Sequence, residues 1–271
     1  MTMTPYIIAQ VSDMHVRAGG ELSNGLVDTA AALRRCIDHL LQLKQRPHVV
    51  LFTGDLVDSA VAAEYEELRR LLAPLPMPWY LIPGNHDDRD VLRECFPDHA
   101  YLRQWAPYVQ YTIEDAPLRL IGLDTVIPGE GGGRLCEERL DWLDRTLAAG
   151  GDRPTLVFMH HPPFLCGIHR MDEIRLEAPE RLAEVLSRHP RVERLICGHV
   201  HRSIQTRFAG TVASTCPGSA HQIFLDLAAD TPVQFTLEPP GYQLHLWSRD
   251  AGVVSHTVAV GDFPGPFPFT D

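Results

Sequence analysis

Long hydrophobic runs are missing from this sequence. No segment approaches the ~18 consecutive apolar residues that a membrane-spanning helix needs. Residues 1–10 also lack the basic stretch and the small-residue cleavage site of a signal peptide. We therefore expect a protein that is neither exported nor embedded in a membrane, with the cytoplasm as its location.

Cysteine is sparse and unpaired along the chain. The six cysteines are scattered through 271 residues, and no two form a Cys-x-x-Cys pair. This spacing favours buried, reduced thiols over a disulfide framework. The cysteines therefore agree with a cytoplasmic location.

Positive charge is scarce as well. The 24 lysines and arginines are outnumbered by 35 acidic residues, which gives a formal net charge of -11. The long-range field of such a chain repels polyanions, which argues against a long nucleic-acid track and against a membrane-surface protein. An anionic substrate must therefore be small and must be attracted by a local positive centre.

What the sequence does contain is the pattern of an α/β enzyme. A chain of 271 residues can bury one large core, so we expect a catalytic domain over residues 1–258 and an irregular Pro/Gly/Phe-rich arm over residues 259–271. Compact apolar runs predict strands over residues 6–11, 48–53, 79–82, 108–113, 118–123, 155–159 and 194–197. Apolar residues at helical spacing predict helices over residues 26–44, 60–72, 137–148 and 179–188.

The C-terminal third has a different residue pattern from the rest of the chain. Residues 203–257 show successive strand patterns with short turns and no convincing helix, which predicts a second, antiparallel sheet. Two sheets flanked by helices are expected as a result. Residues 129–133 are too rich in glycine for a regular element and are expected to form a mobile loop.

Five short clusters of metal-capable side chains each follow a predicted strand. They are Asp13-Met14-His15, Gly54-Asp55, Gly84-Asn85-His86-Asp87, His160-His161-Pro162-Pro163 and Gly198-His199-Val200-His201. In α/β proteins, ligands and catalytic groups collect at the carboxyl ends of strands. The five clusters are therefore expected to converge on one rim of the sheet.

Local geometry suggests which members of a cluster act together. Side chains two residues apart in an extended chain point the same way, so Asp13 pairs with His15, and His199 pairs with His201. Neighbours point oppositely, so we choose His160 as a ligand and give His161 a supporting or packing role. The glycines that precede three clusters would let the backbone turn tightly toward a crowded centre.

This ordered set resembles the signature of the calcineurin-like metallophosphoesterases. The closer resemblance is to the branch of bacterial glycerophosphodiesterases and class III cyclic-nucleotide phosphodiesterases, carried also by the run from Tyr80 to Asp88 and by Pro217-Gly-Ser-Ala-His-Gln222. The resemblance implies a four-layer αββα sandwich, made of two mixed sheets flanked by helices. It also implies a dinuclear metal site at the carboxyl ends of the strands.

The family pattern, carried over by position, implies two metal sites. The first metal is held by Asp13, His15, Asp55 and His201. The second shares Asp55 as a bridge and is completed by Asn85, His160 and His199. The mixed oxygen and nitrogen donors suit divalent Fe, Zn, Mn or Co better than calcium. Because the charge of two divalent ions exceeds that of the two carboxylates and a hydroxide, the centre stays positive and attracts an anion.

The implied reaction is in-line attack on phosphorus by a metal-bound hydroxide. His86 is expected just outside the metal shell as a catalytic residue, with Asp58 to orient it. The predicted substrate contacts are His86, Asn85, His221 and Arg17. The expected substrate is a small phosphodiester of the cyclic-nucleotide or glycerophosphodiester type.

Three alternatives stay open on sequence alone. The same core could serve a phosphomonoesterase or a nucleotide pyrophosphohydrolase, because the fold and the metals do not rank phosphate esters. A catalytically silent scaffold that binds another protein is a reading of a different class. A homo-oligomer is possible, and the sequence does not determine it.

Overall fold

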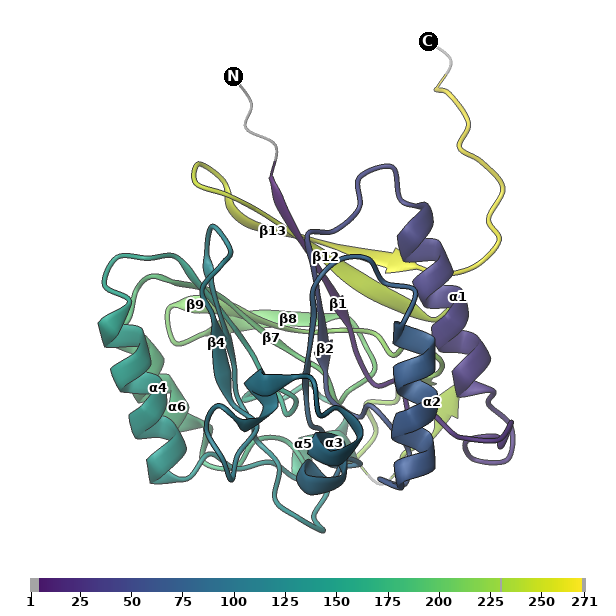
Figure 1. Cartoon of the computed structure of the whole chain (residues 1–271), viewed down its shortest axis with the longest axis horizontal. Coiled ribbons are helices and arrows are strands. Elements are labelled where there is room, and N and C mark those ends of the chain that lie inside the picture. The colour runs from purple at the N-terminus through teal and green to yellow at the C-terminus, as the bar shows by residue number, and fades with distance from the viewer. Residues whose placement is uncertain (1–4, 230, 270–271) are drawn as a thin grey trace.

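Two β-sheets pack face to face between two pairs of helices in the computed structural model, which describes residues 5–229 and 231–269 (Figure 1). The main core lies between the sheets and under the helices of the first sheet. A second core lies between the second sheet and its helices. The predicted four-layer αββα sandwich is therefore confirmed.

The first sheet has five strands in the order β13-β12-β1-β2-β3. The strands are β1 (Tyr6–Val11), β2 (Val49–Thr53), β3 (Trp79–Ile82), β12 (Gly241–Ser248) and β13 (Gly252–Ala259). β1, β2 and β3 run parallel to one another. β12 is antiparallel to its two neighbours, β1 and β13. The central strands β1 and β2 are almost fully buried, as their unbroken apolar runs predict.

The second sheet has six strands in the order β4-β5-β6-β7-β9-β8. The strands are β4 (Tyr111–Ile113), β5 (Arg119–Gly122), β6 (Thr155–Phe158), β7 (Val192–Cys197), β8 (Ile204–Phe208) and β9 (Thr211–Thr215). The four central strands are parallel and the two edge strands are antiparallel. Both sheets are thus mixed. A separate small hairpin pairs β10 (Gln222–Ile223) with β11 (Phe235–Thr236).

Helices cover the outer faces of both sheets. α1 (Thr29–Gln42) and α2 (Ala62–Leu72) contribute to the core of the first sheet, and α4 (Glu137–Ala149) and α6 (Pro179–Ser187) contribute to that of the second. The remaining helices are α3 (Arg89–Cys95), α5 (His169–Glu173) and the 3-10 helix η1 (Ala100–Arg103). α3 and α5 lie at the end of the sandwich where β1 and β2 finish (Figure 1). Among the described residues, no helix is long and apolar enough to cross a membrane.

The prediction that residues 203–257 form their own antiparallel sheet is wrong. β8 and β9 extend the second sheet, β12 pairs with β1 in the first sheet, and β13 pairs with β12. β10 and β11 form the separate hairpin. The alternating pattern of these residues identified strands correctly, but alternation does not specify which strand becomes the neighbour. The C-terminal strands therefore belong to two sheets that the earlier strands begin.

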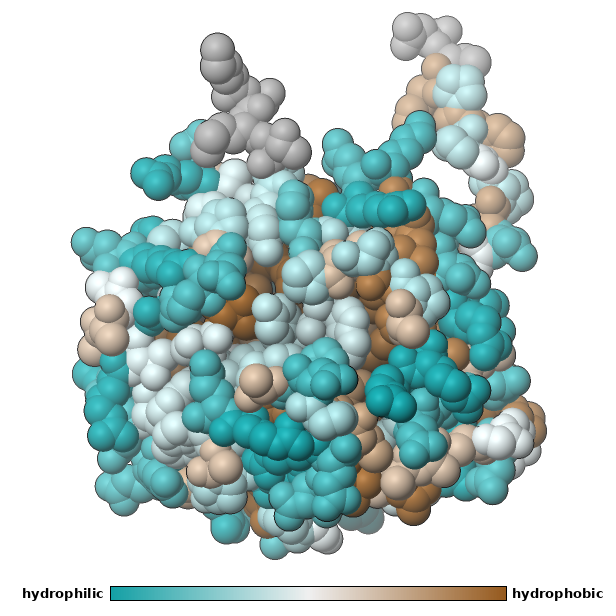
Figure 2. Space-filling model, in the orientation of Figure 1, coloured by the Kyte–Doolittle hydropathy of each residue, from teal (hydrophilic) through white to brown (hydrophobic). Residues whose placement is uncertain are grey.

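The last described residues leave the body of the molecule. Beyond β13, residues 260–269 contain no helix or strand and extend away from the sandwich (Figure 1). The face in Figure 2 is mainly hydrophilic with scattered hydrophobic patches. The C-terminal segment carries three exposed aromatic residues, Phe263, Phe267 and Phe269. These three rings are exposed and do not pack back onto the domain.

Candidate metal centre

The five sequence clusters meet at one end of the sandwich. Asp13 follows β1, Asp55 follows β2 and Asn85 follows β3, all in the first sheet. His160 follows β6, and His199 and His201 follow β7, in the second sheet. The expected convergence at the carboxyl ends of the strands is therefore what the structure shows, with the two sheets supplying opposite halves of the centre.

One carboxylate oxygen lies between two groups of histidines. Asp55 Oδ2 is 3.6 Å from His15 Nε2 and 3.3 Å from His160 Nε2. The other oxygen, Oδ1, accepts a hydrogen bond of 2.9 Å from the backbone N–H of His86. Asp55 is thus oriented by its Oδ1 atom, and its Oδ2 atom faces both groups as a bridging ligand must.

The first group contains Asp13, His15, Asp55 and His201, whose potential ligand atoms lie within 4.8 Å of one another. His15 Nε2 is 3.2 Å from His201 Nε2, and His201 Nε2 is 3.6 Å from Asp13 Oδ1. Asp13 Oδ1 accepts from the backbone N–H of His199, while Asp13 Oδ2 is buried without a hydrogen-bond partner. An unpaired carboxylate oxygen inside a protein is costly unless a cation satisfies it.

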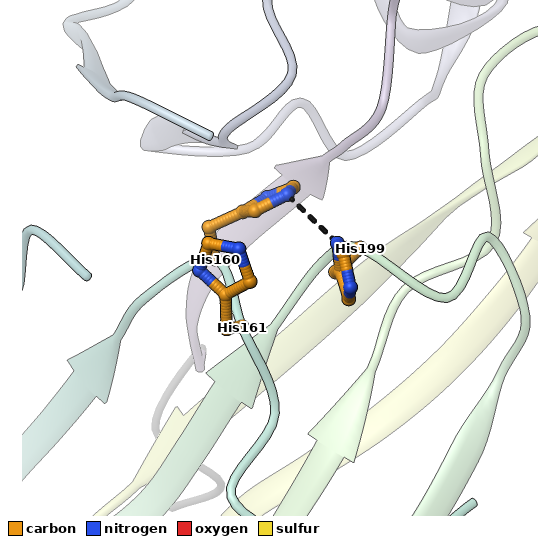
Figure 3. Close-up of side chains that lie close together, drawn as sticks. All are labelled: His160, His161 and His199. Carbon is orange, nitrogen blue, oxygen red and sulfur yellow. Dashed lines mark hydrogen bonds between the residues drawn. The ribbon is translucent and has the colours of Figure 1, made fainter. Parts of the chain in front are cut away.

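The second group surrounds His160 Nε2. This atom is 3.1 Å from Asn85 Oδ1 and 3.3 Å from His199 Nδ1. Figure 3 shows His160 and His199 facing each other across this contact, with the ring of His161 beside them. The group thus brings together an amide oxygen, two imidazole nitrogens and the shared Asp55 oxygen.

Hydrogen bonds set the histidines in the form that binds metal. The Nδ1 atom of His160 is 2.8 Å from the carbonyl oxygen of Thr53, and Nδ1 of His201 is 3.1 Å from that of His221. A carbonyl oxygen only accepts, so each Nδ1 carries a proton and Nε2 is the nitrogen that can offer a lone pair to a metal ion. Facing lone pairs repel unless a cation lies between them, so the donor set fits two metal ions.

The backbone at the ligands is strained. Positive φ angles occur at Asp13 (55°), His15 (44°), Asp55 (47°), His199 (73°) and His201 (49°). Residues with a β-carbon rarely adopt this left-handed region, and such strain concentrates at functional sites. Asp13 and His15 do point together, but the reason we gave, alternation in an extended chain, is wrong. The left-handed turns, not a strand, aim both side chains inward.

The glycines before the ligands are required by close packing, as predicted. A β-carbon on Gly54 would lie 2.4 Å from His160 Nδ1, and one on Gly84 would lie 2.2 Å from Asp55 Oδ1. A β-carbon on Gly198 would lie 2.2 Å from the Ser12 hydroxyl oxygen. Each glycine therefore lets a neighbouring strand end approach the centre.

Burial and mutual charge set the protonation of this centre. Burial raises the pKa of Asp13 to about 6. Burial also acts to raise the pKa of Asp55, but His160 and His15 outweigh it and hold that pKa well below its usual value. For His160, burial acts to lower the pKa and Asp55 overrides it, so the pKa rises to about 9. A proton on His160 thus occupies a position that a metal ion takes when it binds.

Two of the predicted ligand histidines, His199 and His201, have pKa values far below the usual range of histidine. Burial, reinforced by His160, lowers the pKa of His199 to about 3, and burial, reinforced by His15, lowers the pKa of His201 to about 3. Neutral imidazole is the form that ligates a metal. Protons therefore compete little with metal at these two residues.

The predicted catalytic pair is arranged differently from expectation. The Asp58 carboxylate lies 3.2 Å from His15 Nδ1, so it orients a predicted metal ligand. His86 is held instead by the backbone carbonyl of Asp58, which its Nδ1 contacts at 2.9 Å. His86 is exposed and lines the cavity beside Asn85.

Of the other two predicted substrate contacts, one lines the cavity and the other is paired within the protein. His221 lines the cavity over the metals, and its ring lies 4.8 Å from that of His201. Arg17 is paired within the protein, donating to Glu64 at 2.9 Å and also to Glu21 and Ser59. The guanidinium of Arg17 therefore stabilises the loops around α2, and the structure does not present it as a phosphate contact.

The centre forms the floor of an open cavity of about 340 Å³. One wall is apolar and consists of Met171, Ile174 and Ile223. A groove of about 660 Å³ shares Asp58, Asn85 and His86 with this cavity and continues to Pro128 and Gly129. The metals are thus reached from solvent by a small molecule on either side of His86.

Sequence reasoning assigned no role to Asp87 in this site. Asp87 is buried and accepts hydrogen bonds from Gly84 N, Leu56 N and the Tyr65 hydroxyl, which fixes the segments that carry Asp55 and Asn85. Its place in the Gly-Asn-His-Asp cluster was the available signal. The short helix α5, which supplies Met171 to the apolar wall, was not predicted, because five residues are too few to show helical periodicity.

Comparison with known proteins decides the family. The profile of the family described as "Calcineurin-like phosphoesterase" matches residues 6–203. The chain belongs to this family. As a calcineurin-like phosphoesterase it is a metal-dependent phosphoester hydrolase, and enzymes of the family use two divalent metal ions.

Relatives of this calcineurin-like phosphoesterase align over nearly its whole length. It is 40% identical over 264 residues to the protein named "Probable glycerophosphodiester phosphodiesterase GpdQ" of Arcobacter nitrofigilis, which covers 97% of this chain and 96% of that one. It is 30% identical over 247 residues to the 3',5'-cyclic adenosine monophosphate phosphodiesterase CpdA of Pseudomonas aeruginosa, covering 90% and 85% of the two chains. A dimetal phosphatase from Danio rerio superimposes with a TM-score of 0.64 at 17% identity, over 95% of this chain and 100% of that one, which shows a shared fold.

Proposed function

We propose that this protein hydrolyses small phosphodiesters of the glycerophosphodiester or cyclic-nucleotide type. The proposal assigns Asp13, His15, Asp55 and His201 to the first metal. It assigns Asp55, Asn85, His160 and His199 to the second. The position of Asp55 Oδ2 between the two groups is the observation that carries the proposal, because one shared oxygen is what a bridged metal pair requires.

The protein's own groups then bind and orient the substrate. Two bound ions supply Lewis acidity and an activated water near neutral pH. His86 Nε2 faces the cavity beside Asn85 and is placed to hydrogen-bond a phosphate oxygen or to hold a proton for the departing alcohol. His221 closes the opposite side near His201. A small-molecule substrate agrees with the cavity volume of about 340 Å³ and with the net charge of -11.

The names of the relatives support diesters over the alternatives. The 40% identical protein is named for glycerophosphodiesters and the 30% identical one for cyclic AMP. Phosphomonoesters and nucleotide pyrophosphates remain alternatives, because the same metals attack them equally well in principle. A silent scaffold has no support, since every predicted ligand position is filled and faces the centre.

An activity panel tests the proposal directly. Metal-reconstituted protein is assayed with a glycerophosphodiester, cyclic AMP, a model diester and the matching monoester, and kcat/KM is compared. We expect the diesters to exceed the monoester by at least tenfold, or about 1.4 kcal/mol in transition-state binding. A preference for the monoester would overturn the diester assignment and leave the metal assignment intact.

Asp55→Ala tests the metal assignment. We expect it to lose both ions and at least 100-fold of kcat/KM, because removing a bridging carboxylate weakens two sites at once. Metal content is measured by elemental analysis, and Asp115→Ala, an exposed carboxylate on the β4–β5 turn, serves as the control. Two ions per chain and unchanged hydrolysis in Asp55→Ala would contradict the bridging role.

A further inference from the structure

His161 is a fully buried histidine whose two ring nitrogens are both occupied. Nδ1 lies 2.8 Å from the Thr125 hydroxyl, and Nε2 lies 3.1 Å from the carbonyl oxygen of Gly131. Because the carbonyl can only accept, Nε2 carries the proton and Nδ1 accepts from the Thr125 O–H. Neither nitrogen is left for a metal, although His160, His161 and His199 lie close enough to form a metal-capable group.

The ring of His161 packs against two proposed ligands of the second metal. Its centroid is 4.8 Å from that of His160, with the rings at 86°, and 4.7 Å from that of His199. Figure 3 shows the ring of His161 beside the pair of histidines that face each other. A shift of His161 therefore moves or releases both of them.

The same residue anchors the glycine-rich loop of residues 129–133. Besides the bond to Gly131, the loop backbone passes so close that a β-carbon on Gly133 would lie 2.4 Å from the His161 ring. The peptide of Gly133 also bonds to Arg175 O and Glu177 N. The glycines here allow close approach to His161, and the other end of the loop, at Gly129, lines the groove beside His86.

We propose that His161 is a positioning residue that couples the glycine-rich loop to the second metal site. It holds His160 and His199 by ring contact and the loop by its Nε2–H, while the Thr125 hydroxyl donates to Nδ1 and holds the other side of the ring. Order in the loop and affinity for the second ion are then linked. The metal and loop measurements below do not depend on which ester the enzyme cleaves; the KM comparison rests on the proposed function.

Two amide substitutions at His161 separate the hydrogen bond to Thr125 from the hydrogen bond to the loop. The amide of His161→Asn falls near the position of Nδ1, so it keeps a partner for Thr125 and loses the bond to the loop. The amide of His161→Gln reaches the position of Nε2 and can donate to Gly131. Thr125→Val, which has the shape of threonine, removes the hydroxyl that donates to Nδ1 and leaves the ring held on one side only.

We expect His161→Asn to weaken the second ion by about tenfold, the lower end of losses seen when a residue that supports a ligand is replaced. Calorimetric titration with manganese should show the first ion unchanged. Hydrogen exchange should speed up at the amides of residues 130–134, and KM for a diester should rise more than kcat falls. His161→Gln should restore slow exchange and most of the affinity, and Thr125→Val should resemble His161→Asn.

His245→Asn is the matched control, because His245 is equally buried and lies away from the loop. It should lower the melting temperature without a selective loss of the second ion. If His161→Asn instead keeps wild-type affinity for the second ion and wild-type exchange in the loop, the proposal is overturned. Should His161→Asn fail to fold, Thr125→Val decides by the same two measurements. A diester assay that fails while these two measurements succeed would overturn the proposed function alone.

Discussion

At the scale of single residues, the ligand histidines differ in what holds their outer nitrogen. His160 and His201 donate to backbone carbonyls, whereas the outer nitrogen of His15 faces the carboxylate of Asp58. A carboxylate partner makes an imidazole a stronger metal ligand than a carbonyl does. If His15 binds the first metal as proposed, Asp58 acts on that metal through His15.

Asp58→Asn should weaken binding of the first ion by about tenfold, because the amide oxygen still accepts from His15 but no longer carries charge. The second ion should bind as before, since His160 does not contact Asp58. Calorimetric metal titration measures both sites. Asp144→Asn is the control, because Asp144 accepts a 2.6 Å hydrogen bond from His189 away from the centre. A loss confined to the second ion would disprove the role assigned to Asp58.

The sequence allowed the metal-site residues to be chosen but not their supporting partners. The order of the clusters and their place after apolar runs pointed to Asp13, Asp55 and His160 together. The partner of Asp58 was misjudged, because His15 and His86 both lie near it in space and only the fold decides which one meets the side chain. Pairing between distant segments has no local signal in one sequence.

At the scale of elements, the turns that follow the strands matter more than the strands themselves. β1 and β3 were predicted with their observed ends, and β2 begins one residue after its predicted start. The left-handed residues just beyond these strands could not be foreseen, because aspartate and histidine rarely adopt positive φ without tertiary support. The short helix α3 was also missed.

Gly54→Ala tests the close approach at one of these turns. Gly54 (φ 89°) and Gly210 (φ 86°) have the same backbone conformation, but a β-carbon at Gly210 meets open space. Gly210→Ala should cost about 1–2 kcal/mol of unfolding free energy from the left-handed backbone alone. Gly54→Ala should cost about 1–3 kcal/mol more, because the new methyl overlaps His160. Urea unfolding measures the difference, and equal losses in the two variants would refute the packing argument.

At the scale of the whole molecule, a buried polar network joins the two sheets. Gln10 on β1 donates to Thr53 on β2 and to the carbonyl of Cys197 on β7. His245 on β12 donates through Nε2 to Gln10 Oε1 and accepts from Ser255 through Nδ1. Burial, reinforced by Arg194, lowers the pKa of His245 to about 3, so it stays neutral in the folded protein.

This network makes folding stability depend on pH. The pKa of histidine in an unfolded chain is about 6.5. Below that pH, His245 is protonated in the unfolded chain but stays neutral in the folded chain. Stability is therefore fully present above pH 6.5 and falls as the pH drops toward 3, by up to about 1.4 kcal/mol per pH unit for this group. His245→Gln should flatten the slope by one proton in urea unfolding between pH 7 and 4. His256→Gln, at an exposed site on β13, should keep the wild-type slope.

The division of the ligands between the sheets has a mechanical consequence. Asp13, Asp55 and Asn85 sit on one sheet, and the ligand histidines after β6 and β7 sit on the other. With the proposed ligands, two bound ions would join the two halves of the sandwich and close a chain loop, as a reversible crosslink does. An enzyme built this way ties its fold to its metal supply: at a thousandfold excess of metal over the dissociation constant, each ion adds about 4 kcal/mol to its resistance to unfolding.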